Sequence, residues 1–318
     1  MSFRSMLLSS LRPTAASGRL GVQVGAAGAS GAVVSRPPGA KPRLTALHAA
    51  SGEAALPRLA RWRRQLGLRH APVNLLIDGG DYQILPLDVP EVQPGEVANA
   101  MRWRVKDMID FPPEEASIGC LLLPNASDSS RTQQALVVVS HRDTIARWMQ
   151  RTYDANLELD SIDVPELALR NLALLAAGEG ACALLHVGLD RSTLVMVWRG
   201  ELCSLRRFDV RASQFLAAGK DDFDALVERL GQDVQRSSDA FERQFYAAAL
   251  GRLWVTQEQA GLDLAAQLAS HITLQVRPLV LREWIAIEID ADTPLMDSAQ
   301  GIDFLPAIGA ALREAAAP

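Results

Sequence analysis

The sequence predicts an α/β protein built from two similar lobes, and three observations carry this prediction. With 318 residues, 48% of them hydrophobic and 22% charged, the chain can bury a substantial core. Apolar segments joined by tight turns occupy residues 20–50, and a second run of the same plan occupies residues 181–210. Predicted helices follow each run, so the two halves of the chain suggest an internal duplication.

The first run, residues 20–50, predicts three antiparallel strands. Residues 20–34 hold two apolar segments around a turn rich in Gly and Ala, residues 35–42 form a loop because Pro-Pro and Gly break periodic structure, and a third strand follows. The glycines match neither the Gly-Lys-Ser/Thr phosphate loop nor the dinucleotide pattern, because their spacing differs and no helix follows. We expect Gly25 to serve the turn itself, through a positive φ or close packing.

The second run, residues 181–210, repeats this plan. A strand ends at Val187, a turn follows at residues 188–191, and a buried strand continues to Trp198. A tight turn then leads into a third strand. Gly188 holds the place that Gly25 holds in the first run, and we expect it to serve its turn in the same way.

A helix is predicted over residues 96–109. Val97, Met101, Val105 and Met108 follow one another in steps of three and four, so they share one face, which we expect to pack inward. Trp103 lies about 120° from Val97 around a helix of 3.6 residues per turn. Its indole therefore needs a different cover from the inward face.

Three more helices are expected further along the chain. Arg142 and Asp143 are predicted to open a helix after the apolar strand at residues 135–140, and residues 303–314 predict a closing helix. Residues 224–245 predict a long helix with an apolar stripe at helical spacing. The stripe consists of Leu226, Leu230, Val234, Phe241 and Phe245.

Charge, cysteine and histidine content exclude several classes of function. The net charge of −5 argues against a general nucleic-acid binder. Cys120, Cys182 and Cys203 have no metal-like spacing, so we expect small core residues in a reducing compartment. The five histidines are scattered, and we predict no metal site. No apolar run is long enough for a membrane span.

The N-terminal segment is basic, because no acidic residue precedes Glu53. Phe3, Leu7 and Leu11 fall on one face of a short helix. We predict a terminal tail; peripheral contact with an acidic membrane surface is the alternative, and the composition also resembles an organellar transit peptide.

Three segments resemble those of one protein family. They are ANAMRWRVKDMIDFPPEEA at residues 98–116, DALVERLGQDVQRSSDAFERQF at residues 224–245, and PAIGAALRE at residues 306–314. Together they are similar to the PilM and MshI proteins of type IV and mannose-sensitive pilus assembly, and more to MshI than to PilM. The resemblance spans roughly residues 20–315 and implies the actin-like, ribonuclease H-like fold, in which nucleotide lies between two lobes.

The resemblance also implies that the nucleotide site is degenerate. Actin-like ATPases end the first strand of each lobe near an Asp that holds the Mg²⁺ shell, and Gln23 and His186 stand at those positions here. The first loop retains Gly25 and the hydroxyl of Ser30, and the second loop retains Gly188. The glycine turn that approaches the adenosine corresponds to Thr256, Gln257 and Glu258. We therefore predict no catalytic residue, no cofactor and no enzyme, while weak ATP binding without turnover stays open.

The partner site is predicted on the helix at residues 96–109 and the turn after it. Trp103 and Phe111 are expected to line an apolar groove whose rim carries basic side chains, since Trp and Arg often anchor partners. The full set is Arg102, Trp103, Arg104, Lys106, Phe111 and Pro112. In the resembled family a small subdomain here helps to hold the cytoplasmic N-terminal tail of a bitopic inner-membrane protein. The alternative is that a neighbouring part of the chain covers Trp103.

The predicted architecture has lobe I at residues 18–166 with an inserted subdomain near 85–125, lobe II at 167–302, and a C-terminal helix at 303–318 that returns to lobe I. Residues 127–133 are predicted to form a surface hairpin tip. The predicted function is a non-catalytic cytoplasmic scaffold, peripheral to the inner membrane, that docks the tail of a pilus-assembly protein and couples it to a motor ATPase. The alternatives are an ATP-binding or ATP-hydrolysing protein of the same system and a type II secretion assembly-platform component.

Overall fold

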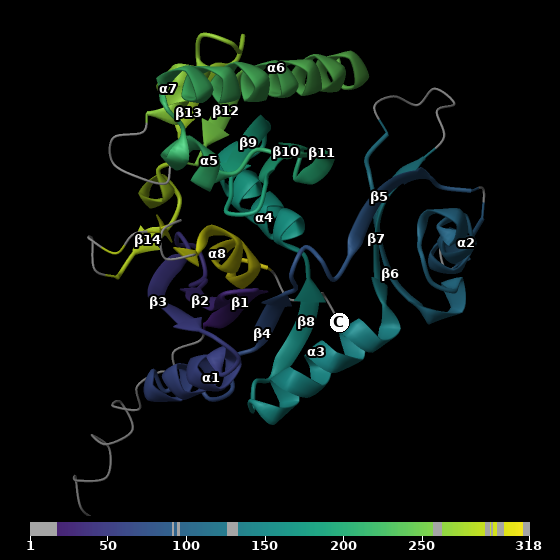
Figure 1. Cartoon of the computed structure of the whole chain (residues 1–318), viewed down its shortest axis with the longest axis vertical. Coiled ribbons are helices and arrows are strands. Elements are labelled where there is room, and N and C mark those ends of the chain that lie inside the picture. Colours follow the sequence, from purple (N-terminus) through teal and green to yellow (C-terminus); the bar gives the residue numbers. More distant parts are fainter. Residues whose placement is uncertain are drawn as a thin grey trace, which may run out of the picture.

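The computed structural model describes residues 18–90, 92–93, 96–125, 133–256, 263–289, 293, 295–297 and 302–313. Three main sheets organise this part of the chain, and two central helices lie between the two larger sheets (Figure 1). The predicted N-terminal tail, most of the hairpin tip at residues 127–133, and Gln257 and Glu258 lie outside the described residues.

The first sheet has six strands in the order β14-β3-β2-β1-β4-β8. Its strands are β1 Arg19–Gly25, β2 Gly28–Ser35, β3 Arg43–Ser51, β4 Val73–Leu76, β8 Leu159–Asp163 and β14 Ala286–Ile287. β1, β2 and β3 form the predicted antiparallel meander, and β4 and β8 continue the sheet in parallel. α1 (Ala55–Gln65) packs on β2 and β3.

The second sheet repeats this strand order. It runs β11-β10-β9-β12-β13, with an antiparallel meander followed by two parallel strands. Its strands are β9 Ala181–Val187, β10 Ser192–Trp198, β11 Glu201–Phe208, β12 Arg252–Val255 and β13 Gln275–Pro278. The predicted internal duplication is therefore present in the topology, and the predicted residue boundaries of the lobes stay a prediction.

Helices cover the second sheet on both faces. α4 (Pro165–Ala177) contacts β9 and β10 on the side of the first sheet, whereas α6 (Lys220–Gln244) and α7 (Leu264–Leu268) contact β11, β12 and β13. α5 (Ala212–Ala217) precedes α6. The predicted stripe of the long helix is confirmed, since its members are buried or packed against the core.

A three-stranded sheet, β5-β7-β6, forms the inserted unit. β5 (Gln83–Asp88), β6 (Ala116–Leu122) and β7 (Gln134–His141) are antiparallel. One face of this sheet packs against α2 (Val97–Arg104), and α3 (Arg142–Asp154) leads from β7 back to β8. Arg142 and Asp143 open α3 as predicted.

The helix predicted over residues 96–109 is shorter than expected. It ends at Arg104, and a 3-10 turn at Lys106–Met108 follows. Met101 and Val105 are buried as predicted, but Met108 is 49% exposed because the tighter turn rotates it off the inward face. The prediction for Met108 was therefore wrong.

α8 (Leu305–Ala311) joins the two halves of the molecule, where Figure 1 shows it between the two larger sheets. It packs on β1, β2, β4 and α4. The contact with β1 is backbone to backbone, because a Cβ at Gly21 would lie 1.9 Å from the Ala307 carbonyl oxygen. A Cβ at Gly309 would similarly lie 2.2 Å from the Ala168 carbonyl oxygen. Two glycines thus permit the close seating of this helix.

The glycine roles predicted for the two turns are half correct. A Cβ at Gly188 would lie 2.9 Å from the His186 ring and 3.0 Å from the Arg191 carbonyl oxygen, so close packing requires glycine there. Gly25 has open space around its Cβ position, and its φ is not positive. The first hairpin instead needs Gly28, which has φ +154° and lies against the backbone of β3.

Candidate functional site

The two predicted phosphate-loop positions lie at the ends of β1 and β9, near the start of α8. His186, at the end of β9, is buried and uses both ring nitrogens within the protein. Its Nε2 lies 2.8 Å from Oδ2 of Asp303, a distance at which the ring N–H donates to the carboxylate, and its Nδ1 lies 3.2 Å from Oγ1 of Thr256. The amide of Val187 also donates to the Thr256 hydroxyl over 3.0 Å.

Asp303 is a site residue that the sequence analysis missed. It ends β16 (Ile302–Asp303), which pairs with β15 (Met296–Asp297), and it is buried. Its carboxylate also accepts a hydrogen bond from the amide of Leu305, and its carbonyl accepts one from the Ser30 hydroxyl over 2.9 Å. An Asp just before a closing helix is an ordinary helix-start signal, so no local pattern distinguished it.

Ser30, Asp303, His186 and Thr256 therefore form one polar chain. It connects β2 of the first sheet, the start of α8, β9 of the second sheet and the residue after β12. We call this set the interlobe polar chain. Because the His186–Asp303 pair is buried and bonded at both ends, it holds the two halves of the molecule together at the predicted phosphate positions.

Gln23 brings no charge to the end of β1. Its side-chain oxygen is buried and has no hydrogen-bond partner in the described part of the chain. A carboxylate that the sequence analysis did not consider, Asp78, follows β4, and its Oδ1 accepts from the amide of Gly80. A Cβ added at the neighbouring Gly79 would lie 3.3 Å from the Arg191 guanidinium. The loop after β4 therefore lies close to the turn after β9.

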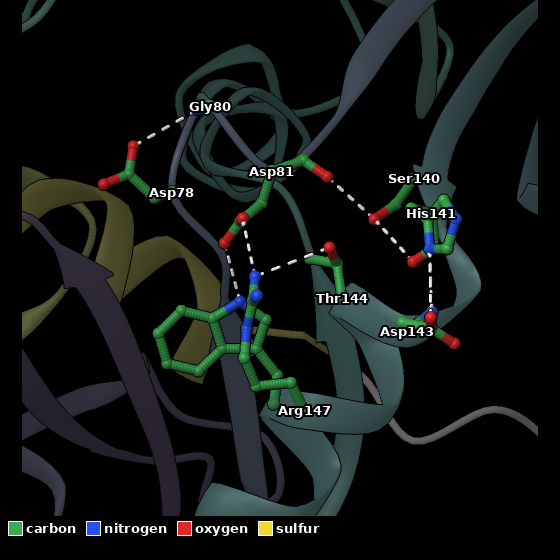
Figure 2. Close-up of polar contacts among 9 residues, drawn as sticks. Asp78, Gly80, Asp81, Ser140, His141, Asp143, Thr144 and Arg147 are labelled. Carbon is green, nitrogen blue, oxygen red and sulfur yellow. Dashed lines mark hydrogen bonds and ion pairs between the residues drawn. The ribbon is translucent and has the colours of Figure 1, made fainter. Parts of the chain in front are cut away.

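The loop after β4 is anchored to α3 (Figure 2). The Asp81 carboxylate accepts hydrogen bonds from Trp148 Nε1 over 2.7 Å and from Arg147 over 3.2 Å, and its carbonyl accepts one from the Ser140 hydroxyl. Figure 2 also shows His141 at the start of α3, where its Nδ1 accepts the amide of Asp143. These contacts hold the inserted sheet against the first sheet.

A groove of about 870 Å³ lies between the inserted sheet and the rest of the molecule. β6 forms one wall, α4 forms the other, and the ends of β4, β8 and α8 form the floor. The five consecutive residues 117–121 of β6 line the groove although their side chains alternate in direction, so the open edge of this strand borders the groove. No strand in the described residues pairs with that edge.

The groove combines apolar side chains with basic groups. Leu121, Leu167 and Leu174 supply apolar surface, and the Arg170 guanidinium has a buried Nε without a hydrogen-bond partner among the described residues. Asp163 forms an ion pair with Arg313 over 2.5 Å. Burial raises the pKa of the Asp163 carboxyl, and the Val164 amide and the Arg313 guanidinium oppose this shift.

The three cysteines differ in access. Cys182 and Cys203 are buried core residues, and burial raises the pKa of each thiol to about 12. Cys120 on β6 is half-buried and packs with the side chains on the α2 side of the inserted sheet, and burial raises the pKa of its thiol as well. In the described residues, no cluster of three or more His, Cys, Asp or Glu side chains is placed to hold a metal ion.

The residues predicted to bind a partner lie on the other face of the inserted sheet. Trp103 is 57% exposed on α2, whereas Phe111 is half-buried and packs edge-on against His141 with ring centroids 5.0 Å apart. Arg102 has a buried Nε without a hydrogen-bond partner in the described chain. Arg104, Lys106 and Pro112 are exposed. None of the six lines the groove.

Comparison with solved structures identifies two similar arrangements. The PilM–PilN type IV pilus biogenesis complex contains a chain that superposes with a TM-score of 0.68 at 20% identity, covering 92% of this chain and 97% of that chain. The cytoplasmic domain of EpsL, an inner-membrane component of the type II secretion system of Vibrio cholerae, gives a TM-score of 0.51 at 16% identity, covering 94% and 96%. No protein-family model and no curated protein matches the chain.

The repeated strand order and these similarities define the class of fold. The protein has the duplicated, actin-like α/β fold with an inserted sheet that the sequence resemblance implied. Its structure resembles PilM and the cytoplasmic domain of EpsL, which belong to pilus and type II secretion assembly. None of the helices in the described ranges combines the length and hydropathy needed to cross a bilayer.

Proposed function

We propose that this protein is a non-catalytic cytoplasmic scaffold of a type IV or mannose-sensitive pilus assembly machine. Its groove takes the cytoplasmic tail of an inner-membrane assembly protein, and the similarity to a chain of the PilM–PilN type IV pilus biogenesis complex supports this assignment. A motor ATPase is a second partner under this proposal. The observation that carries it is the groove bordered by an open strand edge, in a protein whose two strand-end phosphate positions hold Gln23 and His186 in place of carboxylates.

The absence of catalysis is supported by the chemistry at the two loop positions. Gln23 carries no charge, and both nitrogens of His186 are already bonded to Asp303 and Thr256. Mg²⁺ in phosphoryl transfer prefers carboxylate oxygens and water, so neither side chain is a suitable ligand. The Asp303 carboxylate is bonded to His186 and to the Leu305 amide.

We expect no Mg²⁺-dependent ATP hydrolysis above background from the purified protein. Phosphate release measures this, and a thermal-shift titration measures binding, since a ligand at about 100 times its Kd stabilises by roughly 2.7 kcal/mol. A melting temperature that does not change at millimolar Mg-ATP would support the absence of ATP binding. Hydrolysis that disappears in Asp78→Asn, Asp190→Asn or Asp303→Asn would contradict the proposal, because these carboxylates lie on the loops and strand ends near the predicted phosphate positions.

The docking role is supported by the shape and chemistry of the groove. An extended peptide added to an open strand edge gains main-chain hydrogen bonds, and pockets beside the edge give specificity for alternate side chains. The groove offers leucines for apolar side chains and Arg170 for a carbonyl or carboxylate of the peptide. An extended apolar tail with one acidic or amide group fits this arrangement.

Filling the groove is expected to abolish docking without loss of stability. The Cβ position of Gly119, in the middle of β6, has no atom within 4 Å, so Gly119→Phe places a ring in the groove without a backbone clash. The protein first captures a single-span membrane protein from detergent-solubilised membranes of its source. A synthetic peptide of that protein's cytoplasmic tail is then titrated by calorimetry, and we expect at least a tenfold rise in Kd for Gly119→Phe.

A matched control makes this result specific. Gly251→Phe adds the same ring at another exposed glycine with free space, outside the groove, and should bind the peptide normally. If Trp103→Ala abolishes binding and Gly119→Phe does not, the tail docks on the α2 face that the sequence predicted, and the groove assignment is wrong.

The similarity to EpsL supports the alternative of a type II secretion assembly platform. The two machines differ in the partner that the protein binds. Recovery of a type II secretion component instead of a pilus-assembly protein in the same capture experiment would favour this alternative.

A further inference from the structure

A second surface, formed around α1, is strongly basic. The first 70 residues contain eleven basic residues and one acidic residue, Glu53, although the whole chain has a net charge of −5. Within the described residues, a large share of this positive charge lies on α1 and the turn after it. The charge is therefore concentrated at one end of the first sheet.

The helix presents its arginines outward. Arg58, Arg61 and Arg64 recur every third residue, which places them within about 120° of one another around the helix. Leu56 and Leu59 are buried on the opposite side against β2 and β3. Together with Arg69 just after the helix, three outward arginines form an exposed basic face.

These arginines lack acidic partners in the described chain. The Arg58 guanidinium donates to the Ser51 carbonyl, and no side-chain hydrogen bond or ion pair joins Arg61, Arg64 or Arg69 to another described residue. Two acidic side chains near this end of the molecule are engaged elsewhere: Asp160 pairs with Arg19, and Glu158 pairs with His70. A solvated arginine face with no internal counter-charge is available to an external anion.

Exposed apolar side chains lie at the same end of the molecule as the arginines. Leu66 follows α1, and Met149 and Tyr153, four residues apart on α3, are 53% and 77% exposed. Arg63 connects the ends of the two helices by donating to the Asn156 carbonyl over 2.8 Å. Figure 1 shows α1 and the C-terminal end of α3 at the same end of the molecule, opposite α6.

We propose that this surface rests on an anionic lipid bilayer. We call it the α1 face, and it consists of Arg58, Arg61, Arg64, Arg69, Leu66, Met149 and Tyr153. Arginines near an anionic leaflet bind its headgroups, and a tyrosine sits at the headgroup level with its ring toward the acyl chains. Exposed apolar side chains among the arginines favour lipid over a nucleic acid, whose phosphates need only the basic groups.

A membrane contact of this kind goes beyond the proposed docking function and does not require it. If both hold, the α1 face keeps the groove near the bilayer from which the partner's tail emerges, and the second contact raises the effective concentration of the tail. Vesicles without any protein partner test the lipid contact alone. Failure of one proposal is thereby distinguishable from failure of the other.

Sedimentation of the full chain with vesicles tests the proposal. We expect binding to phosphatidylcholine vesicles that contain phosphatidylglycerol and no binding to pure phosphatidylcholine. Each basic residue near such a surface contributes about fivefold to the partition coefficient, so Arg61→Glu with Arg64→Glu should lower it by well over tenfold. Binding should also weaken when salt is raised from about 0.1 M to 1 M, because the screening length falls from about 10 Å to 3 Å.

A matched pair of substitutions controls for net charge. Lys220→Glu with Arg243→Glu changes the total charge equally on exposed positions of α6 and should leave vesicle binding intact. Met149→Ser with Tyr153→Ser should lower the binding that remains at high salt. Equal losses in the two charge-reversed proteins, loss of binding only on deletion of residues 2–17, or binding to duplex DNA in place of vesicles would each overturn the proposal.

Discussion

Replacing Gly21 by alanine is expected to destabilise the protein by about 3 kcal/mol or more. The new Cβ would lie 1.9 Å from the carbonyl oxygen of Ala307 and 2.7 Å from the amide nitrogen of Ala311, and both atoms belong to the backbone of α8. A backbone clash cannot be relieved by a rotamer change, so α8 must move away from β1. Because α8 also packs on β2, β4 and α4, this movement loosens the centre of the molecule. The urea midpoint and the melting temperature measure the loss.

The same strand supplies the control for this prediction. Gly25 ends β1 with no atom within 4 Å of its Cβ position, so Gly25→Ala should change stability by no more than about 0.5 kcal/mol. Equal losses of stability at both positions would show that the destabilisation comes from backbone propensity in β1 and not from the packing of α8.

Removing either member of the His186–Asp303 pair is expected to cost about 3 kcal/mol. Both side chains are buried, and each single substitution to alanine leaves the other without its 2.8 Å partner. The double substitution removes both buried polar groups and should cost less than the sum of the two single changes. A double-mutant cycle in urea measures this coupling, which we expect to exceed about 1 kcal/mol.

Ser30→Ala, which leaves the His186–Asp303 pair intact, provides a comparison for these two substitutions. It removes only the hydroxyl that donates to the Asp303 carbonyl, and its cost should be near 1 kcal/mol. Additive costs for His186→Ala and Asp303→Ala would mean that the interlobe polar chain is not a coupled unit. A coupled result would show that His186 and Asp303 stabilise the contact between the two sheets as one unit.

Local sequence pattern was sufficient for the two meanders, the strand at residues 135–140, four of the helices and the repeated plan of the protein. Apolar runs bounded by glycine turns predicted both meanders, and helical spacing predicted α6 and the buried face of α2, since these signals depend on neighbours within a few residues. Local pattern was less reliable for the exact ends of elements, because the position at which an α-helix tightens into a 3-10 turn depends on packing. Met108 became exposed for that reason.

Only the tertiary structure identified the contacts that define the candidate sites. Asp303 lies 117 positions from His186 in sequence, and no spacing rule connects them. The groove is lined by residues from Arg36 to Arg313 on several elements, and its open edge follows from the pairing order of the inserted sheet. Likewise, Gly21 and Gly28 are required by backbone atoms of distant segments, whereas Gly25 is not. By itself the sequence determined the two meanders, the long helix α6 and which chemical groups stand at the ends of β1 and β9. Where those segments meet was decided by close packing between parts of the chain that are far apart in sequence.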